Sequence, residues 1–167
     1  TLSLHDALPI CQNWPDDVRV AVNISAKDLR SGDVAQMVGT ALASSGLPPH
    51  RLEIEVTETA VIEEREAANL IFRTLAAQGI GIALDDFGTG YSSLSYLQAL
   101  PFTKLKIDRS FVIDVVNNER ALKLLTNVAR LGKDIGHVVT AEGVETEEQL
   151  ALISAHSDVD QIQGYLF

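Results

Sequence analysis

Carboxylate and carboxamide side chains stand at positions in this sequence where they could bind hard metal ions. Adjacent Asp85 and Asp86 would let one carboxylate bridge two ions while the other binds one, with Glu55 and Asn23 as further oxygen ligands. Without metal, so many carboxylates would repel one another, and some would take up protons. Two divalent ions about 3.5 to 4 Å apart can generate hydroxide from bound water and clamp a phosphodiester for in-line displacement. The residue types favour Mg²⁺, Mn²⁺ or Ca²⁺ over copper or structural zinc.

The charge of the chain narrows the range of ligands. With 13 Lys and Arg against 23 Asp and Glu, the formal net charge is −10. Side chains alone would therefore repel a polyanion, which argues against a DNA or RNA polymer as partner. A phosphate ligand would need metal cations, as the carboxylates suggest.

The composition indicates a packed globular domain. The hydrophobic share is 46% and the charged share 22%, which excludes disorder and collagen-like repeats. No apolar stretch approaches the roughly 18 residues of a membrane span, and no basic segment opens a signal peptide. The single Cys11 cannot form an internal disulfide. We expect a cytoplasmic domain, whose parent protein could still be anchored to a membrane.

Short β-branched runs alternate with longer runs whose apolar residues recur at helical spacing. This alternation predicts an α/β fold of βα units around a parallel sheet. No linker interrupts it, so we expect one domain. Near the end, Thr146 and Gln149 predict a capping box at the start of the last helix. Strands are predicted over residues 18–24, 51–56, 80–84, 104–107 and 138–141, with a short strand around 162.

The alternation of side chains along these strands predicts where the polar residues meet. Each predicted strand has an aliphatic face for the helices and a polar residue at the carboxyl end of its other face. In a parallel barrel these ends open at one mouth, where catalytic groups gather. The residues predicted to converge are Asn23, Glu55, Asp85, Lys106, Glu142 and Gln163.

The segment from Asp85 to Leu97, Asp-Asp-Phe-Gly-Thr-Gly-Tyr-Ser-Ser-Leu-Ser-Tyr-Leu, is the most specific stretch of the sequence. With five shorter motifs in the family's order, it resembles the EAL domain. The resemblance implies a TIM-like (β/α)₈ barrel and a metal-dependent phosphodiesterase that hydrolyses cyclic di-GMP to linear pGpG in bacterial second-messenger signalling. The shorter motifs are Val-Asn-Ile-Ser at 22–25, Glu-Val-Thr-Glu at 55–58, Lys-Leu-Lys-Ile-Asp at 104–108, Glu-Gly-Val-Glu at 142–145 and Gln-Gly-Tyr at 163–165.

The resemblance also implies roles for the matching residues. Lys106 would orient the attacking water and offset phosphate charge, and Glu142 would bind metal or position that water. Glu58 would brace the loop after Asp86, and Asp108 would complete the catalytic set. The implied ligands of two Mg²⁺ or Mn²⁺ ions are Asn23, Glu55, Asp85, Asp86 and Glu142.

The remaining matches are implied to shape the substrate site. Gly88 and Gly90 would let the loop turn tightly and move, and Tyr91 leads into the next helix. Glu145 and Gln163 would belong to the polar mouth.

Several of these residues have simpler interpretations. Asp85 and Asp86 could form a turn, Lys106 could be a solvated strand lysine, and Glu145 could favour the start of a helix. A non-catalytic EAL-like module that binds cyclic di-GMP or a protein partner is the main alternative function. Such modules should lose metal ligands, and every ligand position covered here is filled. An unrelated carboxylate-metal barrel enzyme acting on carbon acids would not explain the glycine-rich loop.

The resemblance covers residues 11–167, and a complete barrel takes about 250 residues. The first strand, with the Glu-Ala-Leu motif, and the last βα unit have no counterpart. We therefore expect a partial EAL domain that is inactive by itself, within a parent enzyme. Residues 1–10 do not match the family and are expected to be a non-native junction. For the parent we expect a homodimer fused to sensory or GGDEF-type domains.

Overall fold

The computed structural model describes residues 4–89 and 94–166. The chain divides into two compact units. The first comprises Thr1–Ala83 and Ser95–Pro101, and the second Leu84–Leu94 and Phe102–Phe167. The division falls within strand β3, so each unit receives part of it.

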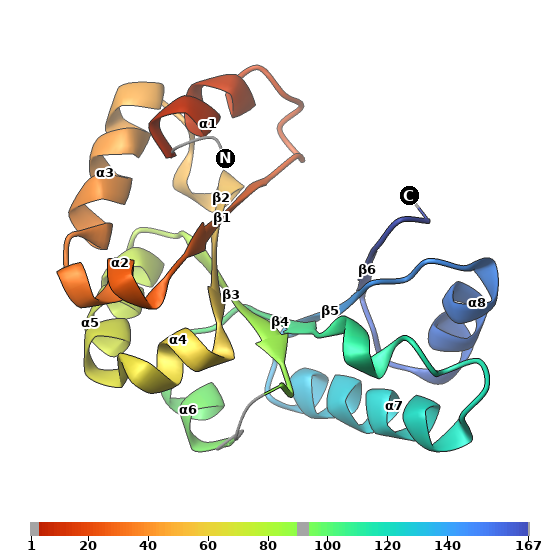
Figure 1. Cartoon of the computed structure of the whole chain (residues 1–167). Helices are drawn as coiled ribbons and strands as arrows, with labels where there is room; N and C mark the ends of the chain where they lie inside the picture. Colours follow the sequence, from red (N-terminus) through yellow and green to blue (C-terminus); the bar gives the residue numbers. More distant parts are fainter. Residues whose placement is uncertain (1–3, 90–93, 167) are drawn as a thin grey trace. The chain divides into compact units, whose positions relative to one another are not determined.

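Six strands form one sheet in which the order of the strands follows the sequence, β1 to β6 (Figure 1). The pairs β1–β2, β4–β5 and β5–β6 are parallel, as predicted. Sequential parallel strands joined by helices are the repeating unit of a TIM-like barrel, so the α/β fold is confirmed. The strands are β1 (Val20–Ile24), β2 (Leu52–Thr57), β3 (Gly81–Phe87), β4 (Lys104–Ile107), β5 (Val138–Glu142) and β6 (Gln161–Gln163).

The first unit has a buried core beside β1 and β2, in which Phe72 and Leu52 are fully enclosed. Buried Arg51 fixes the segment before β1, because its guanidinium donates to the carbonyls of Cys11, Pro15 and Val18 at 2.9 Å each. The helices are α1 (Leu4–Cys11), α2 (Ala26–Ser31), α3 (Val34–Ser45), η1 (Pro49–Arg51), α4 (Glu58–Glu63), α5 (Arg65–Ala77) and α6 (Leu94–Ala99), the last of which starts in the second unit.

The predicted first strand is two residues too long. Val18 lies in a turn, where its amide donates to the Pro15 carbonyl at 3.0 Å and its carbonyl accepts from Arg51. Its backbone groups are therefore not available for a strand ladder, and β1 begins at Val20.

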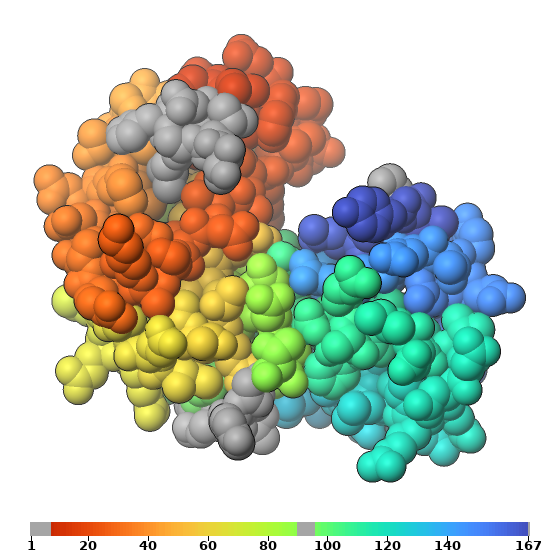
Figure 2. Space-filling view, viewed as in Figure 1, coloured from red at the N-terminus to blue at the C-terminus, as the bar shows by residue number. Residues whose placement is uncertain are grey.

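The second unit packs η2 (Arg109–Phe111), α7 (Glu119–Asp134) and α8 (Glu147–His156) around β4 to β6. Figure 2 shows α7 at the outer surface of this unit. Its core includes Val112, Leu125, Val144 and Ile153. Gly132 lets α7 approach the sheet, since a Cβ there would lie 2.7 Å from a methyl group of Val139. None of the described helices has the length and apolarity that a membrane span requires.

The predicted capping box at α8 is confirmed. The Thr146 side chain accepts from the Gln149 amide, and the Gln149 side chain accepts from the Thr146 amide at 3.1 Å. These bonds satisfy donors that the first turn of a helix leaves without partners.

His137, just before β5, is a buried group that should make the stability of the second unit depend on pH. It is 7% exposed, and its Nδ1 has no hydrogen-bond partner among the described residues. Burial lowers the pKa of His137 below 6.5, because the charged imidazolium loses its hydration.

We predict that the free energy of unfolding falls as the pH drops below about 6.5. The unfolded chain then binds a proton that the folded chain does not bind until its lower pKa is reached, at a cost of up to about 1.4 kcal/mol per pH unit. His137→Leu should remove this slope when urea unfolding is compared at pH 7.5 and 5.5. The same substitution at exposed His156 controls for loss of a histidine. An identical slope in wild type and His137→Leu would contradict the assignment.

Candidate active site

Three carboxylates of the second unit meet at the ends of β3 and β5. Asp85, Asp86 and Glu142 each offer an oxygen, and these oxygens lie within 4.8 Å of one another. Two of these residues are neighbours in the sequence, whereas Glu142 follows more than fifty residues later. The predicted convergence of Asp85 and Glu142 is therefore seen in the structure, where Asp86 joins them, and the geometry of the three is suited to a divalent cation.

The conformation of Asp86 explains how two adjacent residues reach one cluster. In a regular strand successive side chains point to opposite faces. Asp86 instead has a φ of 54°, the one positive φ at a non-glycine position in the described part of the chain. Aspartate tolerates this left-handed region better than most residues, at a cost of about 1 to 3 kcal/mol. The turn in the backbone allows the Asp85 and Asp86 carboxylates to lie close together.

Buried Lys106 lies between two of these carboxylates. Its Nζ is 3.1 Å from Asp85 Oδ1 and 2.7 Å from Glu142 Oε1, and the residue is 4% exposed. The interpretation of Lys106 as a solvated strand lysine is wrong, because a lysine this deeply enclosed needs anionic partners. Its charge offsets part of the repulsion within the cluster.

One lysine does not balance three carboxylates, and the titration of Asp86 reflects this. The pKa of Asp86 is raised above 3.8, first by burial and then by the negative charges of Asp85 and Asp108. Lys106 opposes these effects by favouring the ionised form. A divalent cation would favour the ionised carboxylate in the same way but more strongly.

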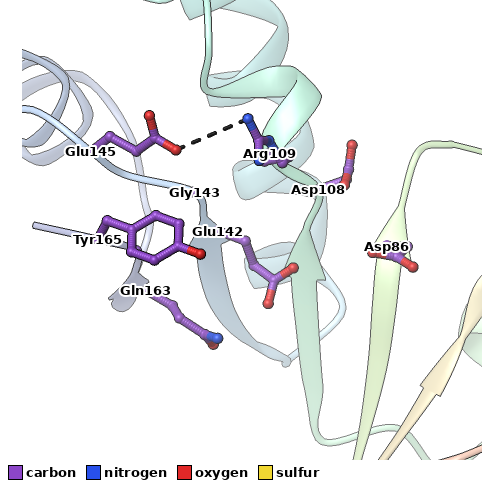
Figure 3. Close-up of a pocket in the computed structure, with 9 residues that line it drawn as sticks. Asp86, Asp108, Arg109, Glu142, Gly143, Glu145, Gln163 and Tyr165 are labelled. Atoms are coloured by element: carbon purple, nitrogen blue, oxygen red, sulfur yellow. Dashed lines mark ion pairs between the residues drawn. The ribbon is translucent and has the colours of Figure 1, made fainter. Parts of the chain in front are cut away.

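A cavity of about 530 Å³ opens beside the cluster. Figure 3 shows its lining side chains, which come from the ends of β3, β4, β5 and β6. Nine residues line it: Asp86, Asp108, Arg109, Glu142, Gly143, Glu145, Gln163, Gly164 and Tyr165. Four predicted site residues besides Asp86 are thus brought together here, at the carboxyl ends of the strands, where barrel enzymes bind their substrates.

The backbone of the loop after β5 is held in place by the side chain of Gln149 and by a close contact at Gly143. Gln149 Oε1 accepts from the Glu145 amide at 2.8 Å, and its Nε2 donates to the Val112 carbonyl at 3.4 Å. Gly143 has a φ of +72°, and a Cβ there would lie 2.5 Å from the Arg109 Cβ. Only glycine fits this position, which brings the ends of β4 and β5 into contact.

The first unit contains three predicted site residues. Asn23 Nδ2 donates to Glu55 Oε2 at 3.4 Å, so these two proposed ligands lie side by side on β1 and β2. The Glu55 residue is 9% exposed and therefore buried, whereas a glutamate on a half-exposed strand would face water. Glu58 is the first residue of α4, after the N-cap Thr57, and is fully buried.

Two predicted loop residues, Gly90 and Tyr91, lie outside the described residues. Gly88 is described and has a φ of +97°, and a Cβ at this position would collide with the Phe111 ring. The positive φ and the close contact both require glycine, as expected for a tight loop.

Arg109 is a cavity residue that the sequence analysis missed. It directly follows Asp108 at the end of β4, and its Nη2 lies 4.0 Å from Glu145 Oε1. Its position just after Asp108, which follows the strand that carries Lys106, was the available signal. No local pattern indicates its distant partner, Glu145.

The lysine contact predicts a large effect on stability. Lys106→Met removes the cation between Asp85 and Glu142 and leaves two carboxylates repelling each other in a partly buried site. We expect the free energy of unfolding, measured in urea with EDTA present, to fall by about 3 kcal/mol. Lys133→Met is the control, since Lys133 is 41% exposed in its pair with Asp160 and should lose less than about 1 kcal/mol. Equal effects of the two substitutions would refute this description of the site.

Comparisons with known proteins agree with this geometry. The EAL domain matches residues 1–167. The bifunctional diguanylate cyclase/cyclic di-GMP phosphodiesterase MucR of Pseudomonas aeruginosa is 37% identical over 98% of this chain, and the cyclic di-GMP phosphodiesterase NbdA of the same organism is 39% identical over 90%. The chain spans 24% and 19% of these proteins.

Solved structures give the same result. The P. aeruginosa MucR phosphodiesterase in complex with c-di-GMP has a TM-score of 0.90 and 35% identity, over 98% of this chain and 67% of that one. Klebsiella pneumoniae BlrP1, in a calcium and cyclic di-GMP complex, has a TM-score of 0.88 and 32% identity, over 98% and 42%. A BlrP1 complex with manganese and cyclic di-GMP matches equally well. With its strand-end carboxylates and its match over the whole length, the chain belongs to the EAL domain family.

Proposed function

We propose that this domain hydrolyses cyclic di-GMP to linear pGpG with the help of two divalent cations. The observation that carries the proposal is the cluster of Asp85, Asp86 and Glu142 oxygens within 4.8 Å of one another beside Lys106. Relatives named as cyclic di-GMP phosphodiesterases support the choice of substrate. Since the chain spans only about a fifth of such relatives, the activity is proposed for a complete domain that carries these residues.

The donor set fits Mg²⁺ or Mn²⁺. Carboxylate oxygens are hard ligands, and the three of the cluster lie beside a single buried lysine. Complexes of the relative BlrP1 with manganese and with calcium support the same class of ion. We propose Asp85, Asp86 and Glu142 as ligands in the second unit and Asn23 and Glu55 in the first. When bound, the ions would lower the pKa of a water molecule and offset the charge of the phosphodiester.

The side chains of the chain would orient the reaction. Lys106, fixed by two carboxylates, would hold the attacking water and offset charge that develops on the phosphate. Glu142 would position the same water, since it contacts Lys106 and lines the cavity. Asp108, Glu145 and Gln163 would contact the bound nucleotide from the cavity wall.

Residues outside the cavity wall would shape the loop after β3. Gly88 would permit its turn, and Glu58 would brace it from the start of α4. Gly90 and Tyr91 would complete the loop.

The biological setting follows from the same relatives. They include multidomain signalling proteins such as the bifunctional MucR and the Escherichia coli oxygen sensor protein DosP, of which the chain spans 24% and 18%. We propose a homodimeric signalling protein that carries further sensory or GGDEF-type domains and acts in the cytoplasm.

Substitution of one ligand tests the proposed reaction. Asp85→Asn keeps the size of the side chain but removes a metal-binding charge, so turnover should fall about a thousandfold or more. The assay is chromatographic conversion of cyclic di-GMP to pGpG by a complete domain with Mn²⁺. Asp134→Asn, on the exposed side of α7, is the matched control and should keep wild-type turnover.

Three results would count against the proposal in different ways. Retention of more than about a tenth of the activity in Asp85→Asn would overturn the ligand assignment. Wild-type binding of cyclic di-GMP without turnover would favour the non-catalytic module. No binding by the wild type would remove cyclic di-GMP as the ligand.

A further inference from the structure

Charge is unevenly distributed over the wall of the cavity. Asp86, Asp108, Glu142 and Glu145 are all acidic, and Arg109 is the one basic side chain among the nine that line it. Lys106 is buried and is already engaged by Asp85 and Glu142. An anionic ligand therefore meets a single accessible cation within the described wall of the cavity.

The Arg109 pair with Glu145 is weak enough to open. Figure 3 marks the ion pair between Arg109 and Glu145 with a dashed line. Arg109 Nη2 and Glu145 Oε1 are 4.0 Å apart, and the two side chains are 59% and 45% exposed. Exposed pairs of this kind contribute little to stability, because water and salt screen them. The guanidinium can exchange this carboxylate for another anion at small cost.

The backbones that carry the pair are by contrast fixed. Gly143 allows the chain to pass directly against Arg109, and Gln149 holds the Glu145 amide at 2.8 Å. The two side chains thus start from well-defined points at the ends of β4 and β5. A side chain whose backbone is fixed, and whose charged end can exchange one partner for another, is suited to ligand recognition.

Cyclic di-GMP carries two phosphodiesters, and the carboxylate cluster would act on one of them at a time if it held metal ions. The negative charge of the second phosphodiester needs a cation nearby, because the other charged side chains in the wall of the cavity are acidic. A guanidinium donates two parallel hydrogen bonds to phosphate oxygens and keeps its charge at any working pH.

We propose that Arg109 binds the phosphodiester that is not being hydrolysed, and that Glu145 is its counter-ion when the cavity lacks a nucleotide. This inference rests on the proposed function, because it takes cyclic di-GMP as the ligand. Glu145 would thus pair with Arg109 in the empty cavity and contact the nucleotide once it is bound.

Nucleotide affinity tests the assignment. Cyclic di-GMP is titrated calorimetrically into the 167-residue chain with Ca²⁺ present, the ion of the BlrP1 complex. Arg109→Gln should weaken binding at least tenfold, and Arg109→Lys, which keeps the positive charge, should weaken it less. Arg130→Gln is the control, since Arg130 is similarly exposed and lies 4.0 Å from Asp134 on α7, away from the cavity. Thermal unfolding of each variant checks the fold.

A second probe separates this inference from the proposed function. Dimethyl phosphate, a simple phosphodiester, is titrated while the arginine Nε–H signals are followed by NMR. The Arg109 signal should shift at concentrations that leave the Arg130 signal unchanged. That result would support the anion site even if cyclic di-GMP failed to bind, which would count against the proposed function alone. If the wild type binds cyclic di-GMP, equal affinities of Arg109→Gln and Arg130→Gln would overturn the inference, and so would equal shifts of the two signals with dimethyl phosphate.

Discussion

Repulsion among carboxylates around one buried lysine is the constraint on which the site depends. Asp85, Asp86 and Glu142 lie close together, and Lys106 contacts two of them from inside the protein. The lysine offsets part of the repulsion, and the pKa of Asp86 is raised first by burial and then by the charges of Asp85 and Asp108. Three carboxylates with one lysine leave negative charge at the cluster, and this charge is suited to binding a divalent cation.

The fold around this cluster supports conformations that would otherwise be unfavourable. Asp86 adopts a positive φ at the end of β3, and Gly88 continues the turn with another. Gly143 does the same after β5, where the chain passes against Arg109. Strained backbone of this kind persists where packing holds it and tends to gather at functional sites. The buried core beneath η2 and α8, with Val112, Val144 and Ile153, supplies that packing in the second unit.

Local patterns were sufficient to predict the strands and the convergence of Asp85 and Glu142. Alternation of side chains depends only on backbone geometry, so the aliphatic and polar faces could be predicted residue by residue. The capping box at Thr146 was predictable for the same reason, because its partners lie three residues apart.

Features that depend on distant parts of the chain could not be predicted. Arg51 binds the carbonyl groups of a segment more than thirty residues away, which shortens β1. The Arg109 contact with Glu145 joins two strand ends and leaves no local pattern. The conformation of Asp86 was also missed, because regular alternation would place its side chain on the face opposite Asp85.

Direct titration of Mn²⁺, followed by the loss of the free-ion EPR signal, tests whether the carboxylate cluster is a metal site. Wild-type protein should bind Mn²⁺, and Asp86→Asn should weaken this binding at least tenfold, because it removes charge from the cluster while Lys106 remains. Asp114→Asn, an exposed change elsewhere in the second unit, should leave the affinity unchanged. Equal Mn²⁺ affinities of wild type and Asp86→Asn would contradict the account.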